Sequence, residues 1–145
     1  MAAHSGHNER PTAGWVRLTP AEAKAFSAES KQAIKATVDL IVERWMKPET
    51  LKHGGRRPGF GDVQDIYTKW RGPSLILVAK RRGGKVADSI VPDFETQSGR
   101  LTLVGVDSFD VSYFRHTGRW WTIQSGCSLD TALKYFREPS MLWPW

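Results

Sequence analysis

The sequence predicts an α+β fold: a long N-terminal helix, or two helices in series, packed on an antiparallel meander sheet of about five or six strands, then a short C-terminal helix. Three observations predict it. Apolar residues recur at helical spacing between residues 26 and 45, short β-type runs begin at residue 62, and helical spacing returns after residue 128. With 145 residues, 40% of them hydrophobic and 25% charged, the chain can bury a core of its own.

A polar arm precedes the first predicted helix. Residues 1–14 contain Gly, Ser, Asn and Pro without periodicity, so we expect a disordered arm in front of a single domain over residues 15–145. Thr19 is placed to cap a helix, with Pro20 at its first position and Glu22 reaching back, a pattern that favours helix initiation.

The predicted N-terminal helix presents one apolar face. Ser27 and Ser30 could divide it into two helices, and Lys47 is expected to end it, because a residue followed by proline disfavours the helical conformation. The residues expected on the face toward the sheet are Phe26, Ile34, Val38, Ile41, Val42 and Trp45.

A glycine-rich loop over residues 53–61 is expected to join the helix to the sheet. The strands are predicted over 63–70, 75–81, 89–96, 101–106, 109–116 and 120–124. Gly83 and Gly84 are expected in a hairpin turn, and residues 97–99 in another. Connections this short favour antiparallel neighbours, and Pro92 predicts a bulge or an edge in the third strand.

The C-terminal helix is predicted from Ser128, its N-cap, to the stop at Pro139. Its apolar residues are Leu129, Ala132, Leu133 and Phe136. The tail from Met141 to Trp145 is too apolar to be left in water. We expect it to pack back on the domain or to contact a protein partner, including a second copy of the chain.

The charge is concentrated. The formal net charge is +6, and residues 52–85 hold nine Lys or Arg against Asp62 and Asp65. Such a region can attract the phosphates of a nucleic acid; it can equally be a solvated set of turns. The candidate nucleic-acid-binding residues are Arg56, Arg57, Lys69, Arg71, Arg81, Arg82 and Lys85, together with Trp120 for base stacking.

A second cluster forms the predicted hairpin tip around His116. Arg115 and Arg119 lie beside it, and these cations would lower the pKa of the imidazole and could neutralise a phosphate. If the protein is an enzyme, these three residues are its candidate catalytic groups; otherwise they form an ordinary turn. At least one of Trp120 and Trp121 is expected in the core.

Two further clusters are less specific. Asp65, Tyr67 and Lys69 alternate along a strand and are predicted to share its outer face, as a binding strip or an ordinary wet surface. Cys127, just before a helix, would have its thiol pKa lowered by the helix dipole, although a small loop cysteine is the commoner case.

Several classes of protein are disfavoured. No phosphate-binding glycine motif or zinc-ligand spacing is present, so we expect neither cofactor nor metal. The longest apolar run, Leu75 to Ala79, is far too short to span a membrane. The polar N-terminus and the single cysteine favour the cytoplasm.

Three strings carry a resemblance: residues 65–70 (DIYTKW), 94–96 (FET) and 113–120 (YFRHTGRW). Together they resemble an uncharacterised family of small bacterial proteins over about residues 62–138, which implies no activity. In architecture the predicted fold is also similar to RelE- and HigB-type ribosome-dependent ribonuclease toxins. That similarity implies a metal-independent ribonuclease using the sheet residues Lys69, Arg71, Tyr113, Arg115 and His116.

Three functions therefore stay open. The first is a small non-catalytic interaction module, which could be dimeric through the tail or an open sheet edge. The second is a basic RNA-binding domain. The third is the ribonuclease. The sequence favours the first, and an enzyme is the least favoured of the three.

Overall fold

The computed structural model describes residues 26–54 and 59–144. The expected N-terminal arm and the Thr19 capping box lie outside the described residues, as do Arg56, Arg57 and Trp145.

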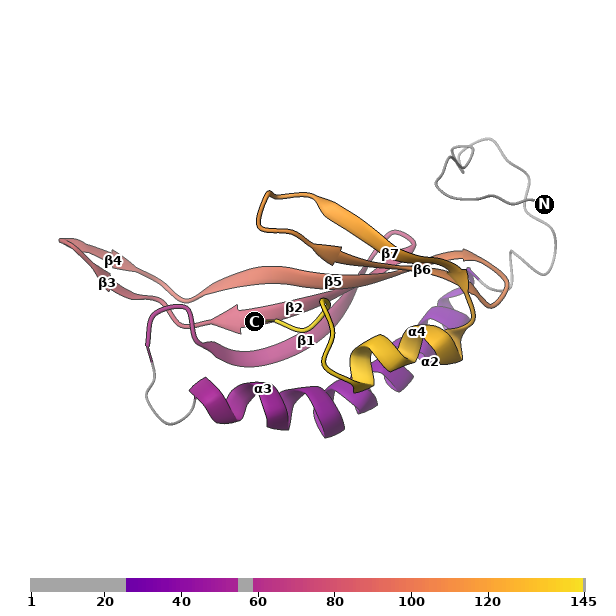
Figure 1. Cartoon of the computed structure of the whole chain (residues 1–145), viewed down its shortest axis with the longest axis horizontal. Helices are drawn as coiled ribbons and strands as arrows, with labels where there is room; N and C mark the ends of the chain where they lie inside the picture. The colour runs from indigo at the N-terminus through magenta and orange to yellow at the C-terminus, as the bar shows by residue number, and fades with distance from the viewer. Residues whose placement is uncertain (1–25, 55–58, 145) are drawn as a thin grey trace.

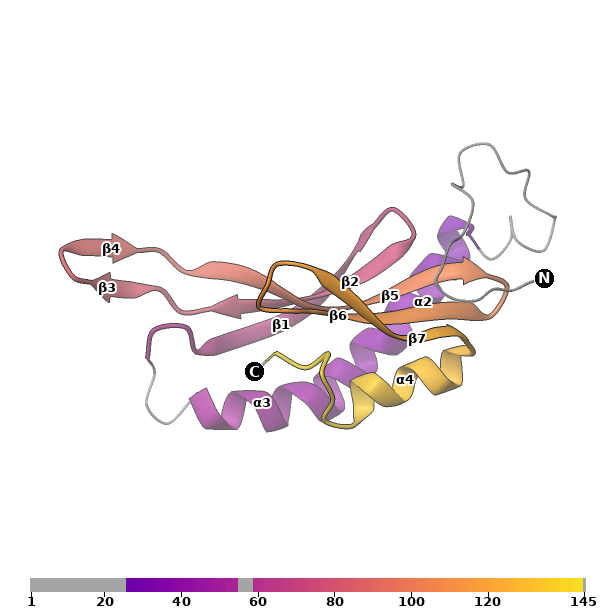
Figure 2. The same ribbon diagram turned by 45° about the horizontal axis from the view of Figure 1, so that its top comes forward.

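The fold is α+β, as the sequence predicts. A five-stranded sheet in the order β1-β2-β5-β6-β7 is antiparallel throughout, and the helices cover one of its faces (Figure 1). A separate two-stranded ribbon, β3-β4, extends the β2–β5 hairpin beyond the sheet (Figure 2). The strands are β1 Val63–Arg71, β2 Ser74–Arg81, β3 Gly84–Val86, β4 Ser89–Val91, β5 Phe94–Gly105, β6 Ser108–Phe114 and β7 Trp120–Cys127.

The prediction that the N-terminal helix ends at Lys47 is wrong. Ser27 caps α2 (Ala28–Ile41), and the segment continues through a π-helical turn, η2 (Val42–Met46), into α3 (Lys47–Gly54). The N–H of Lys47 donates to the carbonyl of Val42, five residues back. Pro48 has no N–H and its ring crowds the carbonyl four residues before it. The wider π turn lies just before this proline, and the helical segment continues through Pro48 without ending.

The prediction that Trp45 faces the sheet is wrong, and the same π turn explains why. The inserted residue rotates the helix face, so that Met46 is fully buried while Trp45 is 48% exposed. The guanidinium of Arg44 lies 5.8 Å from the Trp45 ring. Ile34, Val38 and Val42 face the core as predicted.

The predicted turn at residues 97–99 is wrong, because these residues lie within β5. Strand β4 ends before Pro92, and β5 then continues from Phe94 to Gly105 without a turn. A bulge in β5 leaves Ser98 without a partner residue on β2. Gly99 is needed for close packing rather than for a turn, because a Cβ there would lie 2.7 Å from Leu142 Cγ. The chain reverses instead at Ala87 (φ 55°), since Gly84 belongs to β3.

The C-terminal segment completes the core. Helix α4 (Leu129–Arg137) begins at Ser128, whose hydroxyl accepts from the N–H of Thr131, as the sequence predicts. The tail then returns across the sheet, burying Leu142 and Trp143, and the indole of Trp143 donates to the carbonyl of Phe136 at 3.2 Å.

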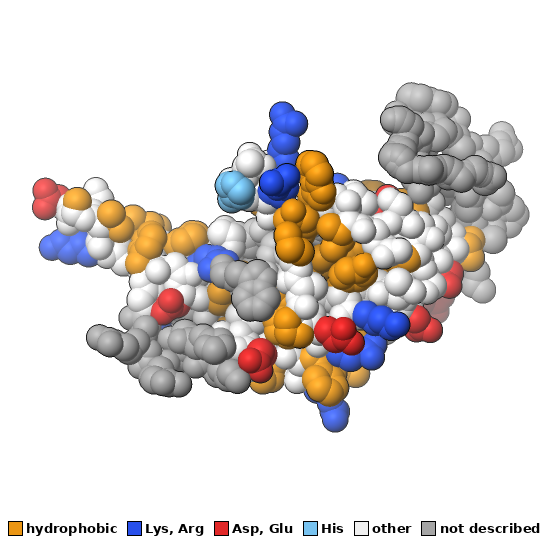
Figure 3. Space-filling model, in the orientation of Figure 1, with side chains coloured by type: hydrophobic (Ala, Val, Ile, Leu, Met, Phe, Trp, Pro, Cys, Tyr) orange, Lys and Arg blue, Asp and Glu red, His pale blue; other side chains and the backbone are white. Residues whose placement is uncertain are grey.

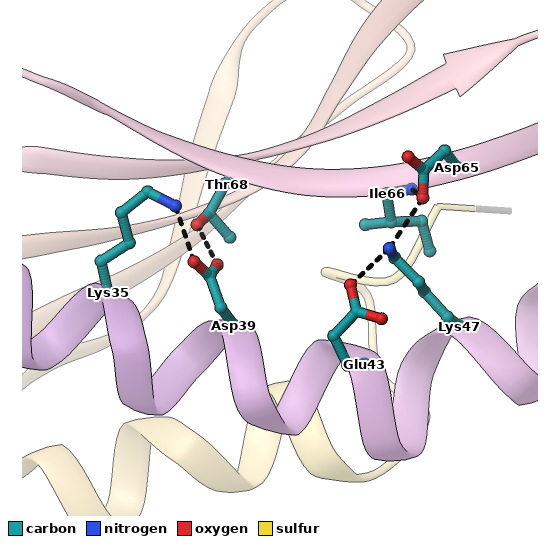
Figure 4. A network of polar contacts seen from close by, with 7 residues as sticks. All are labelled: Lys35, Asp39, Glu43, Lys47, Asp65, Ile66 and Thr68. Atoms are coloured by element: carbon teal, nitrogen blue, oxygen red, sulfur yellow. Dashed lines mark hydrogen bonds and ion pairs between the residues drawn. The ribbon is translucent and has the colours of Figure 1, made fainter.

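A polar network ties the helices to β1 (Figure 4). Lys47 donates to Glu43 and, at 2.8 Å, to Asp65. Asp39 accepts from Thr68 on β1 and, at 2.6 Å, from Lys35. Asp65 therefore turns toward the helices, which corrects its expected place on the outer face.

Candidate binding site

A hollow lies where β6 leaves β5. Strand β5 pairs with β2 from Phe94 onward, whereas its pairing with β6 begins only at Gly99. Figure 1 shows the β6–β7 hairpin rising away from β5 at this point. Within the part of the chain that the structure describes, β5 therefore has no strand beside its outer edge between Phe94 and Ser98.

The hollow has a volume of about 750 Å³, within the range that binding sites occupy. Its polar lining includes Arg81, Thr96, Arg115 and His116, and its apolar lining is Phe94, Tyr113, Phe114, Met141, Trp143 and Pro144. No Asp or Glu lines it among the described residues. In Figure 3 a strip of hydrophobic side chains runs below the β6–β7 tip, where Lys or Arg and His side chains gather.

Two polar side chains of the β5 edge are buried in this hollow without a hydrogen-bond partner among the described residues. Ser98 is only 9% exposed and its hydroxyl is unpaired, as is the side-chain carbonyl of Gln97. A buried polar atom left unpaired costs about 1–3 kcal/mol. Both oxygens are closed to solvent, so a ligand that shifts the β5 edge locally and hydrogen-bonds to them would recover part of that cost.

Two arginines of the hollow, Arg81 and Arg115, are positioned by contacts with neighbouring residues. Arg81 donates from Nε to Thr96 Oγ1 at 2.8 Å and from Nη1 to the carbonyl of Gly61 at 2.9 Å. Arg115 lies on the ring of Trp121, 4.8 Å from its centroid. The exposed side chain of His116 completes the rim.

A smaller hollow of about 500 Å³ lies on the other side of the tail. It shares Arg81 and Trp143 with the first and reaches α3 at Thr50, whose buried hydroxyl has no hydrogen-bond partner in the described structure. The two hollows adjoin each other, because Gly61, Arg81, Trp143 and Pro144 line both.

The sheet face away from the helices carries a second polar surface. Lys69, Ile76, Arg100, Ser112 and Thr122 are successive partners across the sheet, so they form one row on this face. Ile76 is only 2% exposed, because the long side chains around it cover it.

Aromatic and cationic side chains form that cover. The Arg100 guanidinium lies 4.5 Å from the Trp120 ring, which also packs edge-on against Phe114. Lys80 lies 5.5 Å from the ring of Tyr67, whose hydroxyl donates to Glu95. Burial and this carboxylate raise the pKa of Tyr67.

The expectation that Trp120 or Trp121 fills the core is wrong. Trp120 is half-buried under Arg100, and Trp121 is 53% exposed. The reason is that β7 is an edge strand, so the ring positions there are covered by arginine side chains rather than by helices.

The predicted cations do not gather on one surface. Lys69 and Arg71 lie on β1, Arg115 and Arg119 at the opposite edge, on or beside the β6–β7 turn, and Lys85 on the β3-β4 ribbon. Arg82 follows β2, and its Nε is buried without a partner in the described structure. Of the predicted site residues that the structure describes, Arg81, Tyr113, Arg115 and His116 share a hollow.

Sequence reasoning missed Gln97, Ser98 and Arg100. All three fall in or beside the segment predicted as a turn, and a turn offers no sheet face. The alternation of Arg100-Leu101-Thr102-Leu103 indicates a strand from residue 100 onward, but it does not continue through residues 97–99, where a bulge interrupts the pairing.

Cys127 packs into the core and is 8% exposed. Burial raises the pKa of its thiol, with the charges of Asp110 and Asp107 adding to the effect, so the expected activation by the helix dipole is outweighed. Over residues 26–54 and 59–144, no group of three or more His, Cys, Asp or Glu could hold a metal ion. No helix in those ranges is both long and apolar enough to span a membrane.

Comparison with known proteins adds a family but no activity. No curated protein and no solved structure matches the chain. A family model, described as a domain of unknown function, matches residues 26–144, which is wider than the resemblance noted in the sequence and covers the helices, the sheet and the tail. The chain belongs to this family, DUF3024.

Proposed function

We propose that this protein is a non-catalytic interaction module that binds an extended segment of a partner protein along the free edge of β5. The observation that carries the proposal is the unpaired edge between Phe94 and Ser98, on which a buried Ser98 hydroxyl lacks a hydrogen-bond partner in the described structure.

Strand addition fits this edge. A strand that adds to a sheet is held by backbone hydrogen bonds, while alternate side chains enter pockets beside it. A segment lying in line with β6 would run antiparallel to β5 and end against Phe114. The free edge is about five residues long, which suits a short segment rather than a whole strand of ordinary length.

The lining indicates the chemistry of the segment. Phe94, Met141 and Trp143 offer apolar contacts on one side, and Arg115 and His116 offer positive or hydrogen-bonding groups on the other. A segment that alternates apolar residues with Asp or Glu would match both.

The test is selection of short random peptides displayed on phage against the purified protein, followed by fluorescence anisotropy of the selected peptides. We expect extended sequences that alternate apolar and acidic residues. Met141→Asp, at an exposed lining position, should weaken binding at least tenfold, or about 1.4 kcal/mol. Leu40→Asp, at an exposed apolar position on α2, is the matched control and should bind normally.

Ser98→Ala separates binding from folding. The change removes a buried hydroxyl that lacks a partner, so the unbound protein should keep its stability or gain about 1 kcal/mol, while peptide affinity falls. If Ser98→Ala and Met141→Asp both bind the selected peptides as tightly as the native protein, the hollow is not the binding site.

A second candidate, binding of single-stranded RNA, is favoured by one observation on the open sheet face. Arg100 lies over Trp120, and its buried Nε has no hydrogen-bond partner in the described structure. Aromatic rings beside cations suit base stacking with phosphate contacts. The acidic residues Glu95, on the same strand, and Asp110, on β6, reduce the positive charge available there.

Fluorescent oligouridine tests this second candidate. Binding should weaken steeply as salt rises, and Arg100→Ala should weaken it further than Arg137→Ala, at an exposed site on α4. Equal binding by the two variants, or none by the native protein at low salt, rejects RNA binding on this face.

A further inference from the structure

The β3-β4 ribbon, called the arm here, is an exposed apolar structure. It consists of two three-residue strands, Gly84–Val86 and Ser89–Val91, joined at Ala87. Ile90 is 83% exposed and Val86 is 48% exposed, and Figure 3 shows hydrophobic side chains along the length of the arm. A two-stranded ribbon is marginal in water by itself. Its apolar side chains therefore favour a partner surface.

The arm and the hollow lie along one edge. Strands β3 and β4 continue the β2–β5 hairpin, as Figures 1 and 2 show. The side of β4 away from β3 therefore continues the side of β5 away from β2, with a break at Pro92. That side of β5 borders the hollow, which Phe94 helps to line.

This placement suits two-fold symmetry. If an axis crosses the arm near Val91, a second copy's arm lies antiparallel to the first. The tip of the second copy's arm, at Ala87, lies four residues from the axis, or about 13 Å at about 3.3 Å per residue. About four residues from the axis in the other direction, the first copy has Phe94 and Glu95 on β5. The tip of each arm would then meet the beginning of the other copy's hollow, before β6 blocks the edge.

We propose that the occupant of the hollow is the arm of a second copy of this chain, so that two chains form a dimer by exchanging arms. This inference rests on the proposed function and names its partner. Pairing between the two β4 edges satisfies backbone groups that the described structure leaves free, and it covers Ile90 of both copies at once.

Charge supports the choice of occupant. The arm carries Asp88 at its tip, and the hollow offers Arg115 and His116 with no acidic residue among its described lining.

Sedimentation analysis of the full chain over a concentration series tests the dimer. We expect the native protein and the control Leu40→Asp to reach the mass of two chains, and Ile90→Asp to stay at the mass of one with an unchanged circular dichroism spectrum. A native protein that remains a monomer at every concentration, or an Ile90→Asp variant that dimerises like the native protein, overturns the proposal.

Cross-linking gives an independent measurement that needs no destabilised variant. Ser89→Cys, exposed on β4, should be joined to a second copy by a bismaleimide reagent, because the two arms lie side by side. Val106→Cys, which is exposed at the opposite end of β5, is the control and should not. Equal cross-linking at the two positions overturns the arm exchange.

The peptide experiment separates this inference from the proposed function. Selected peptides are measured on Ile90→Asp, whose hollow no arm would occupy. Peptide binding together with a monomeric native protein overturns the arm exchange alone. A native dimer whose mass falls to one chain when peptide is added supports both.

Discussion

Gly99 and Leu142 are packed so closely that no side chain fits between them. A Cβ on Gly99 would lie 2.7 Å from Leu142 Cγ and 2.8 Å from its Cβ. The contact joins the middle of β5 to the C-terminal tail, which are far apart in the sequence. It holds the tail across the sheet, where Trp143 forms part of both hollows.

Gly99→Ala should therefore destabilise the fold by about 1–3 kcal/mol, because the tail must shift to admit the methyl group. Urea denaturation followed by tryptophan fluorescence measures it. Gly105→Ala, at the end of the same strand, is the control: its nearest contact would be an ordinary 3.5 Å to Ser108, and it should change stability little. Equal losses in the two variants would contradict the close packing.

The ion pair of Lys47 and Asp65 predicts a pH dependence. Burial lowers the pKa of Lys47, but the hydrogen bonds and charges of Asp65 and Glu43 outweigh it, so that the net pKa is raised above 10.5. Burial by itself raises the pKa of Asp65, but the contacts with Lys47 and the hydrogen bond from the Ile66 N–H outweigh it, so that the net pKa is lowered below 3.8.

The stabilisation from Lys47 is present below pH 10.5 and is lost as the pH rises through the higher value in the folded protein. The stabilisation from Asp65 is present above pH 3.8 and is lost as the pH falls through the lower value in the folded protein. Lys47→Met should cost up to about 1 kcal/mol between these limits, since the Asp65 side chain is 45% exposed and solvent screens the pair. Urea denaturation at neutral and strongly acidic pH checks it; Lys134→Met, exposed on α4, should show no such pH-dependent difference.

The layers of this fold could be predicted from the sequence, and the reasons are local. The cap at Ser128, the spacing of Leu129, Leu133 and Phe136, and the short connections between strands each determine an element without help from distant residues. The misassigned elements depend on tertiary contacts. Gly99 resembles a turn glycine in the sequence, and only Leu142 explains its presence within a strand.

The candidate site was less predictable for the same reason. Arg115 and His116 could be identified because they flank a turn, but the hollow they border is made by the early end of β6 and by the returning tail. The apolar composition of the tail indicates that it packs on the domain or on a partner, but not where it lies, and the early end of β6 has no pattern in the sequence. Trp45 was misplaced because a single π turn reverses which residue faces the core.

Cys127 should be unreactive in the folded protein. It is 8% exposed, and burial raises the pKa of its thiol. A thiol-specific chromogenic reagent at mildly alkaline pH should react fast only after urea unfolds the chain. Val106→Cys adds a thiol at an exposed position and should react at once in the native state. Rapid reaction of the native protein would show that Cys127 is accessible.

The tail provides the last prediction, because its neighbouring residues Met141 and Leu142 differ in burial. Leu142 is fully buried, and Leu142→Ala leaves a cavity in the core, so it should lower the free energy of unfolding by about 2–5 kcal/mol. Met141 is 55% exposed, and Met141→Ala should cost little stability while removing an apolar contact from the hollow. Urea denaturation and peptide binding, measured on both variants, should therefore give opposite orders of effect. If Met141→Ala destabilises the protein as much as Leu142→Ala does, the tail is fixed mainly by contacts at its exposed side, and the hollow is part of the core rather than a binding site.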